Sequence, residues 1–132
     1  MTLRNPARTK HRDPPASVLV VEDDDDIRDV VVRALAEDGF EVREASSGPA
    51  ALRSVEGERV PDVAVVDLRL PGGVDGQEIC RRLHERGRRV LLCSSSDSLA
   101  AAARASRADD WIAKPFDLDE LRRRVRRLAA AS

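Results

Sequence analysis

Short apolar runs separated by polar segments recur along the chain from residue 17 onward. Runs rich in Val, Leu and Ile predict three buried strands, at residues 17–21, 63–66 and 90–93, and residues 40–45 and 111–113 predict two further strands. Between them, apolar positions recur at helical spacing and predict helices at residues 27–39, 49–55, 79–87, 99–108 and 117–129. This alternation is typical of parallel βαβ units with right-handed crossovers and with helices on both faces of one sheet.

The composition narrows the classes of protein that fit this pattern. The 132 residues suit one domain, and since only 2% of them are aromatic, the core must consist of Val, Leu, Ile and Ala. A net charge of -1 with 36% charged residues favours neither a nucleic-acid binder nor a membrane protein. We expect a cytoplasmic protein, because no apolar run approaches the roughly 20 residues of a membrane span and no secretory signal begins the chain.

The two cysteines, Cys80 and Cys93, do not have a metal-ligand spacing, and each lies within an apolar pattern. We predict that both are buried, reduced thiols, as expected in a reducing compartment.

Residues 1–16 differ from the rest of the chain, because they are rich in basic residues and proline and almost free of apolar ones. We predict a disordered leader there, followed by a single domain over residues 17–130. A nucleic-acid-binding arm is the functional alternative to a solvated tail.

Polar side chains end four of the predicted strands: Glu22 and Asp23, Asp67, Ser94, and Lys114. Alone, Asp67 would be interpreted as an ordinary turn residue. The carboxyl ends of parallel strands, however, meet at one edge of a sheet, and open α/β sheets bind their ligands there. We therefore predict that these side chains converge.

Carboxylates, a hydroxyl and an ammonium group at one edge suit phosphoryl transfer to an aspartate. Carboxylate oxygens are the ligands that Mg²⁺ prefers, and residues 22–26 are five consecutive acidic residues, more than a helix N-terminus needs. The lysine and the hydroxyl would contact oxygens of the incoming phosphoryl group. Asp67 would be the nucleophile and would become an aspartyl phosphate.

Five segments occur together, in order, at a spacing typical of one family: VLVVEDD at 18–24, PDVAVVDLRLP at 61–71, DG at 75–76, SS at 94–95 and ADDWIAKPF at 108–116. With them, the chain from Ser17 to Ala129 resembles the receiver domain of bacterial two-component response regulators. The resemblance implies a flavodoxin-like (βα)5 three-layer sandwich with a parallel five-stranded sheet of order 2-1-3-4-5.

The resemblance also implies roles for individual residues. Asp67 would accept a phosphoryl group from the phosphohistidine of a sensor histidine kinase or phosphotransfer protein. The implied protein ligands of Mg²⁺ are Glu22, Asp23, Asp67 and the main-chain carbonyl of Arg69. Ser94 and Lys114 would contact the phosphoryl group, and the small Ser95 would admit the phosphodonor. The Lys114–Pro115 peptide bond is usually cis in this family.

Trp111 occupies the position of the aromatic switch residue, although an interfacial aromatic on an edge strand is an equal alternative. The implied output face comprises the predicted helix 99–108, strand 111–113 and the last helix, and it would contact a downstream protein. Partner choice is expected to depend on Asp26, Ile27, Val30 and the loop near Pro115.

We expect no turnover of external substrates, because no second general acid or base accompanies Asp67 and neither histidine is placed to serve. Turnover of the domain's own aspartyl phosphate would be tuned at Arg69 and Ser96. The first hypothesis is a receiver without an output domain. The alternatives are a fragment of a longer regulator with a DNA-binding output domain, and a docking module that has lost phosphorylation.

Three departures from the family pattern favour a looser metal loop and a muted switch. The segment Gly72–Val74 makes the turn after Pro71 one residue longer than usual, the stretch from Ser94 to Lys114 is about two residues shorter, and Trp111 is bulkier than the usual Tyr or Phe.

The last helix suggests how the domain associates. Asp109, Glu120 and Arg124 stand at dimer salt-bridge positions of regulators with winged-helix outputs, but Ala100 stands where the basic partner would be. We therefore expect a monomer or a weak homodimer. Five arginines between residues 122 and 127 are interpreted as cations near a helix C-terminus and a solvated face, so no direct nucleic-acid binding is expected.

Overall fold

The computed structural model describes residues 14–95 and 107–131. Its strands are β1 (Ser17–Val21), β2 (Glu41–Ala45), β3 (Val63–Asp67), β4 (Arg89–Ser95) and β5 (Asp110–Lys114). Its helices are α1 (Asp25–Glu37), α2 (Gly48–Glu56), α3 (Gly76–Glu85) and α5 (Leu118–Ala131). Residues 99–106 of the predicted helix at 99–108, together with Ser96 and most of the predicted leader, lie outside the described residues, and residues 107 and 108 are not helical.

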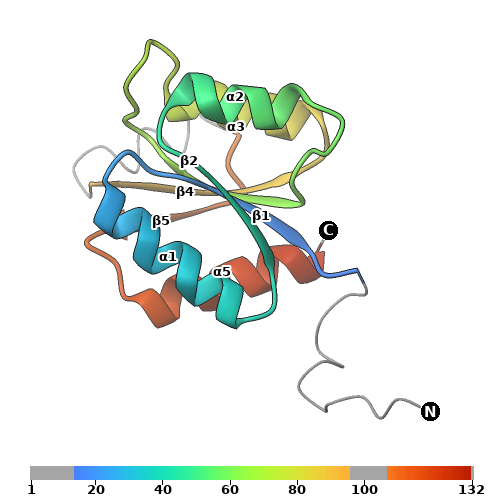
Figure 1. The fold of residues 1–132 in the computed structure, drawn as a ribbon, viewed down its shortest axis with the longest axis vertical. Helices are drawn as coiled ribbons and strands as arrows, with labels where there is room; N and C mark the ends of the chain where they lie inside the picture. Colours follow the sequence, from blue (N-terminus) through green and yellow to red (C-terminus); the bar gives the residue numbers. More distant parts are fainter. Residues whose placement is uncertain (1–13, 96–106, 132) are drawn as a thin grey trace.

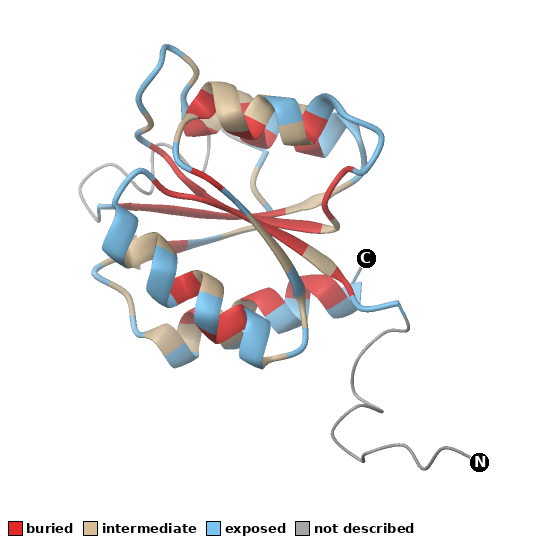
Figure 2. Cartoon of the chain, in the orientation of Figure 1, coloured by how far each residue is buried: buried red, intermediate tan, exposed pale blue. Residues whose placement is uncertain are grey.

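The five strands form one parallel sheet in the order β2-β1-β3-β4-β5, which confirms the predicted topology (Figure 1). Helices α2 and α3 cover one face of this sheet, and α1 and α5 cover the other. Because both faces are covered, the central strand β3 is buried at every residue, and the burial extends to the inner sides of the helices (Figure 2).

Successive strand residues point to opposite faces and build two separate cores. Leu19 and Val21 of β1 belong to the core under α2 and α3, whereas Val18 and Val20 belong to the core under α1 and α5. The buried apolar side chains of the described residues are all aliphatic or Cys, which confirms the prediction drawn from the low aromatic content.

Three helices begin one to three residues before the predicted positions because polar capping residues start them. Asp24, Ser47 and Asp75 each accept a hydrogen bond from a backbone N–H in the first turn of α1, α2 and α3. Gly39 and Gly87, with φ of 94° and 73°, end the segments after α1 and α3 as the sequence predicts.

The connection from β3 to α3 passes close to the strand end. The Gly76 N–H donates to the Leu68 carbonyl at 2.9 Å, and a Cβ on Gly76 would lie 2.2 Å from the Asp67 carbonyl oxygen. Only glycine therefore fits. The longer turn that we predicted to be loose uses positive φ at Gly72 and Gly73, and the Pro71 carbonyl accepts a hydrogen bond from the Gly48 N–H at 3.4 Å.

The arginines of α5 bear out one half of their interpretation and not the other. The described helix continues to Ala131 and has no basic residue in its last turn, so their interpretation as cations at the C-terminus is wrong. The predicted solvated face is confirmed for Arg123, Arg126 and Arg127, which are exposed. Arg122 and Arg126 instead bind Asp38 at the end of α1, at 2.6 and 3.1 Å.

The residues at the predicted dimer positions have partners within the same chain. Arg124 donates to Glu120 at 2.8 Å and to Asp110 at 2.9 Å, and Asp109 accepts from the Val90 N–H at 2.7 Å. Among the helices that the structure describes, none has both the length and the apolar character needed to cross a bilayer.

Candidate phosphoacceptor and metal site

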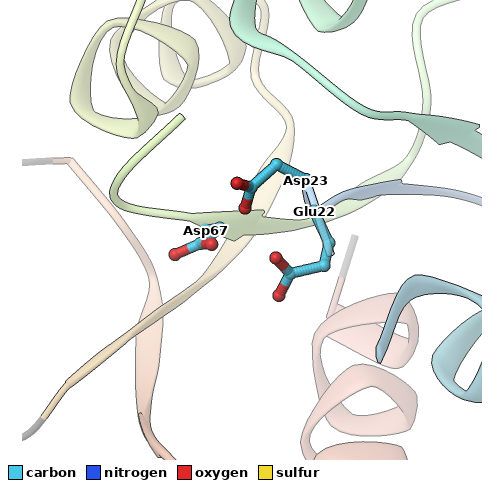
Figure 3. A group of neighbouring side chains, drawn as sticks. All are labelled: Glu22, Asp23 and Asp67. Carbon is cyan, nitrogen blue, oxygen red and sulfur yellow. The ribbon is translucent and has the colours of Figure 1, made fainter. Parts of the chain in front are cut away.

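Three carboxylates gather at the carboxyl edge of the sheet, as predicted. Glu22 and Asp23 directly follow β1, and Asp67 is the last residue of the neighbouring strand β3 (Figure 3). One oxygen from each of the three lies within 4.8 Å of the others. Glu22 and Asp67 are buried and Asp23 is exposed, so the cluster opens to solvent on the side of Asp23.

Lys114, the last residue of the edge strand β5, reaches the cluster across β4. Its ammonium group donates to Glu22 and, at 3.1 Å, to Asp67 Oδ2. Burial alone would lower the pKa of Lys114, but the hydrogen bonds to the two carboxylates outweigh it and raise this pKa above 10.5. The lysine therefore remains charged and bridges the two buried carboxylates. The Lys114–Pro115 bond is cis, as the resemblance implies.

Ser94 lies on the strand beside Asp67. Asp67 pairs in register with Cys93, the Leu68 N–H donates to the Cys93 carbonyl at 2.9 Å, and buried Ser94 is the next residue of β4. Strand β4 continues through Ser94 to Ser95, two residues beyond the predicted end. The predicted hydroxyl is thus at the same edge as the carboxylates and the lysine.

Of two further predicted residues, Arg69 contacts the cluster and Trp111 lies farther back on β5. Arg69, whose carbonyl was expected to bind the metal, is exposed, and its N–H donates to Asp67 Oδ1 at 3.4 Å. Trp111 lies three residues before Lys114 on β5 and is 47% exposed, so in this structure the predicted switch residue points toward solvent.

The sequence analysis missed Asp24 and Arg28. Asp24 caps α1, and its N–H donates to Glu22 Oε2 at 3.1 Å. Arg28 donates to the Glu22 carbonyl at 2.9 Å. The only signal in the sequence is a single cation two residues after a run of acidic residues, and a helical spacing alone does not show that its side chain contacts Glu22.

A groove of about 520 Å³ lies beside the site, between α1 and the connection from β5 to α5. Its lining is mostly apolar, and it comprises Asp26, Ile27, Val30, Val31, Lys114, Pro115, Phe116 and Leu118. The residues singled out from sequence for partner choice all line it. Val30, at 50% exposed, is one of the two large apolar side chains exposed in the described part of the chain.

Comparison with known proteins assigns this arrangement to a family. The sequence model of the response regulator receiver domain matches residues 18–126. The chain belongs to this family. The crystallised receiver domain of NtrX from Brucella abortus is 30% identical, with a TM-score of 0.77 over 87% of this chain and 99% of that one. The receiver domain of the Francisella response regulator 1452 is 27% identical, with a TM-score of 0.74 over 88% of this chain and 98% of that one.

Curated relatives of this receiver domain are longer proteins. The response regulator MprA of Mycolicibacterium vanbaalenii is 37% identical over 118 residues, which cover 86% of this chain and 50% of that protein. The transcriptional regulatory protein CseB of Streptomyces coelicolor is 39% identical over 112 residues, covering 83% and 47%. The chain thus spans about half the length of the curated relatives it matches. Receiver domains of two-component systems interact with histidine kinases or phosphotransfer proteins, and they generally bind Mg²⁺ at an acidic pocket.

Proposed function

We propose that Asp67 accepts a phosphoryl group from the phosphohistidine of a histidine kinase or phosphotransfer protein, and that this reaction requires Mg²⁺. The observation that carries the proposal is the convergence of Glu22, Asp23 and Asp67 within 4.8 Å, beside the ammonium group of Lys114. This set of groups provides a nucleophile, hard ligands for a cation and a fixed positive charge at one sheet edge.

The chain's own residues have distinct parts in this reaction. A carboxylate oxygen of Asp67 attacks phosphorus, a P–O bond forms, the P–N bond to the donor histidine breaks, and the electron pair returns to the imidazole. Lys114 moves from its carboxylate partners toward the new phosphoryl oxygens, and the Ser94 hydroxyl donates to another of them. Mg²⁺, held by Glu22, Asp23, Asp67 and the Arg69 carbonyl, would neutralise negative charge on the transferred group.

The output passes through β5 and α5. Arg124 of α5 donates to the Trp111 carbonyl at 2.8 Å and to Asp110 at 2.9 Å, which couples the helix to the strand that carries Lys114. A shift of Lys114 after phosphorylation would therefore be felt at Trp111 and at α5. Water attack on the aspartyl phosphate, releasing inorganic phosphate, is the only turnover that we propose, and the cytoplasmic location stays a prediction.

The phosphohistidine partner is proposed to dock over the groove beside Val30. This groove leads from exposed apolar positions on α1 to Lys114, so a partner helix lying there would bring its side chains near Asp67. Asp26 at its margin provides a polar contact outside the carboxylate cluster.

The proposal is tested by incubating the protein with Mg²⁺ and acetyl phosphate and measuring its intact mass. We expect one phosphoryl adduct, which is absent in Asp67→Asn and after chelation of Mg²⁺, and which persists in the matched control Asp26→Asn. Absence of an adduct with acetyl phosphate and with a panel of phosphorylated kinases would contradict the proposal and favour a phosphorylation-independent docking module.

A further inference from the structure

Arg28, in the first turns of α1, connects three parts of the molecule. Its guanidinium group donates to the Glu22 main-chain carbonyl at 2.9 Å, to Glu44 of β2 at 2.9 Å and to Asp25 at 2.6 Å. The side chain is only 15% exposed. A guanidinium group fixed in this way at three points has little freedom to move.

These bonds act on the backbone of a predicted metal ligand. The Glu22 N–H donates to the Ala45 carbonyl at the end of β2, at 3.1 Å, and the Glu22 carbonyl accepts from Arg28. Glu44, the residue before Ala45, is the anchor that holds the arginine. Glu22 is thus clamped on both sides of its α-carbon, and β2 provides the support on each side.

The contacts of Arg28 and Asp24 also separate the carboxylates of the acidic segment, residues 22–26. Residues 22–26 are all acidic, and like charges at neighbouring positions repel one another. Arg28 donates to Asp25, whose side chain is 85% exposed, and Glu22 Oε2 accepts from the Asp24 N–H at 3.1 Å. Glu22 and Asp23 are then the two members left at the edge beside Asp67, where Figure 3 shows their carboxylates.

We propose that Arg28 is a positioning residue for the metal site. It holds the β1–α1 connection so that Glu22 and Asp23 are already in their binding positions before the cation binds. This inference rests on the proposed function. Removing a residue that hydrogen-bonds to a metal ligand commonly weakens metal affinity by roughly 10- to 100-fold.

If charge alone mattered, loss of the Arg28 side chain would change the Mg²⁺ affinity in the opposite direction. Arg28 is a cation near the site, so its removal should strengthen the attraction for Mg²⁺ if charge alone matters. The loss of a clamp should instead weaken binding, because the acidic segment would have to be ordered when the ion binds. The direction of the change therefore separates the two effects.

The test measures the Mg²⁺ dissociation constant by isothermal titration calorimetry for the wild-type chain, Arg28→Met and Arg28→Lys. We expect binding to weaken roughly tenfold in Arg28→Met, and also to weaken in Arg28→Lys, which keeps the charge but lacks the planar fork. The matched control is Arg33→Met, which removes the same charge from an arginine of α1 that is 75% exposed and pairs with Asp29. Unchanged or tighter binding in Arg28→Met, or unchanged binding in Arg28→Lys, would overturn the inference.

Hydrogen exchange and phosphorylation rates test the role of Arg28 independently of the titration. Amide hydrogen exchange in metal-free protein should show faster exchange at Asp24 in Arg28→Lys, with β3 and β4 unchanged, whereas equal exchange at Asp24 contradicts the clamp. The rate of phosphorylation by acetyl phosphate should fall at low Mg²⁺ and recover at saturating Mg²⁺, which a general loss of structure would not reproduce. A wild-type chain that binds no Mg²⁺ would refute the proposed function, and the metal-free exchange experiment would still test the clamp.

Discussion

Cys93 lies directly opposite Asp67 in the sheet, one residue before Ser94, and yet it has the character of a core residue. Its side chain is buried in the core under α1 and α5, and burial raises the pKa of its thiol. Cys80 is buried under α3 on the other face of the sheet, and burial raises its pKa to about 12. Both predictions of buried thiols are confirmed, and neither cysteine is suited to be a nucleophile.

We predict that both thiols of the folded protein are nearly inert toward a disulfide reagent. At pH 9 a thiol with a pKa of about 12 is ionised about one time in a thousand, and access is blocked as well. Reaction with an aromatic disulfide, followed by absorbance, should release two equivalents quickly in denaturant and almost none before unfolding. Rapid modification of one thiol in the native protein would show that its environment is more open than described.

For individual residues, the sequence predicts the reactive side chains better than it predicts the residues that position them. Asp67, Ser94 and Lys114 could be placed because each ends an apolar run, and parallel strands bring their ends together. Arg28 could not be placed, since its contacts depend on β2 lying beside β1, and nothing local distinguishes Arg28 from Arg33 on the same helix.

Helices α1 and α5 are held together by a cluster of charges at the C-terminal end of α1. Asp38, just past α1, accepts from two nitrogens of Arg122, at 2.6 and 3.0 Å, and from Arg126 at 3.1 Å. The residues in this cluster are up to 88 positions apart in the chain. A prediction from the local sequence could not identify Asp38 as the partner of these arginines, so it assigned them to the end of the helix.

We predict that Asp38→Asn lowers the free energy of unfolding by roughly 1 kcal/mol near neutral pH. Hydrogen bonds from Arg122 lower the pKa of Asp38 below 3.8. Because the folded-state pKa is depressed, the stabilisation is complete above the unfolded value and is lost as the pH falls through the folded one. Urea unfolding should therefore show a wild-type advantage near pH 7 that shrinks at about pH 2.5.

The control for this experiment is Asp29→Asn, since Asp29 is 58% exposed and pairs along its own helix with Arg33. We expect that substitution to leave stability nearly unchanged at both pH values. A pH-independent loss in Asp38→Asn would mean that the side chain acts through packing instead of charge.

The boundaries of the elements show what a hydrophobic pattern can and cannot locate. The strands were predicted to within one or two residues, and for β1, β3 and β4 this is because their apolar runs are sharply bounded. The starts of α1, α2 and α3 were predicted late, because capping residues such as Asp24 and Ser47 are polar and add nothing to apolar periodicity.

In the whole molecule, two aliphatic cores enclose a sheet whose carboxyl edge collects negative charge. The site is built from the ends of β1, β3 and β5, so its geometry exists only when the sheet is complete. An ion that binds this edge should consequently stabilise the folded state of the entire domain.

We predict that Mg²⁺ raises the thermal unfolding midpoint. At ten times its dissociation constant, an ion that binds only the folded state adds about 1.4 kcal/mol. The increase should be lost in Asp23→Asn, an exposed position where the substitution should not disturb the core, and kept in Asp26→Asn. Calorimetric scans with and without the ion make the measurement, and an equal increase in all three proteins would indicate binding elsewhere.

Trp111 gives this domain a practical property of its own. The chain contains one tryptophan and no tyrosine, so nearly all its near-ultraviolet emission arises from a single side chain. That side chain is half exposed on β5, three residues from the lysine that contacts Asp67. The domain therefore carries a built-in optical label on the edge strand of its proposed output face, and we expect a change in its emission to report phosphorylation at the carboxylate cluster without an attached dye.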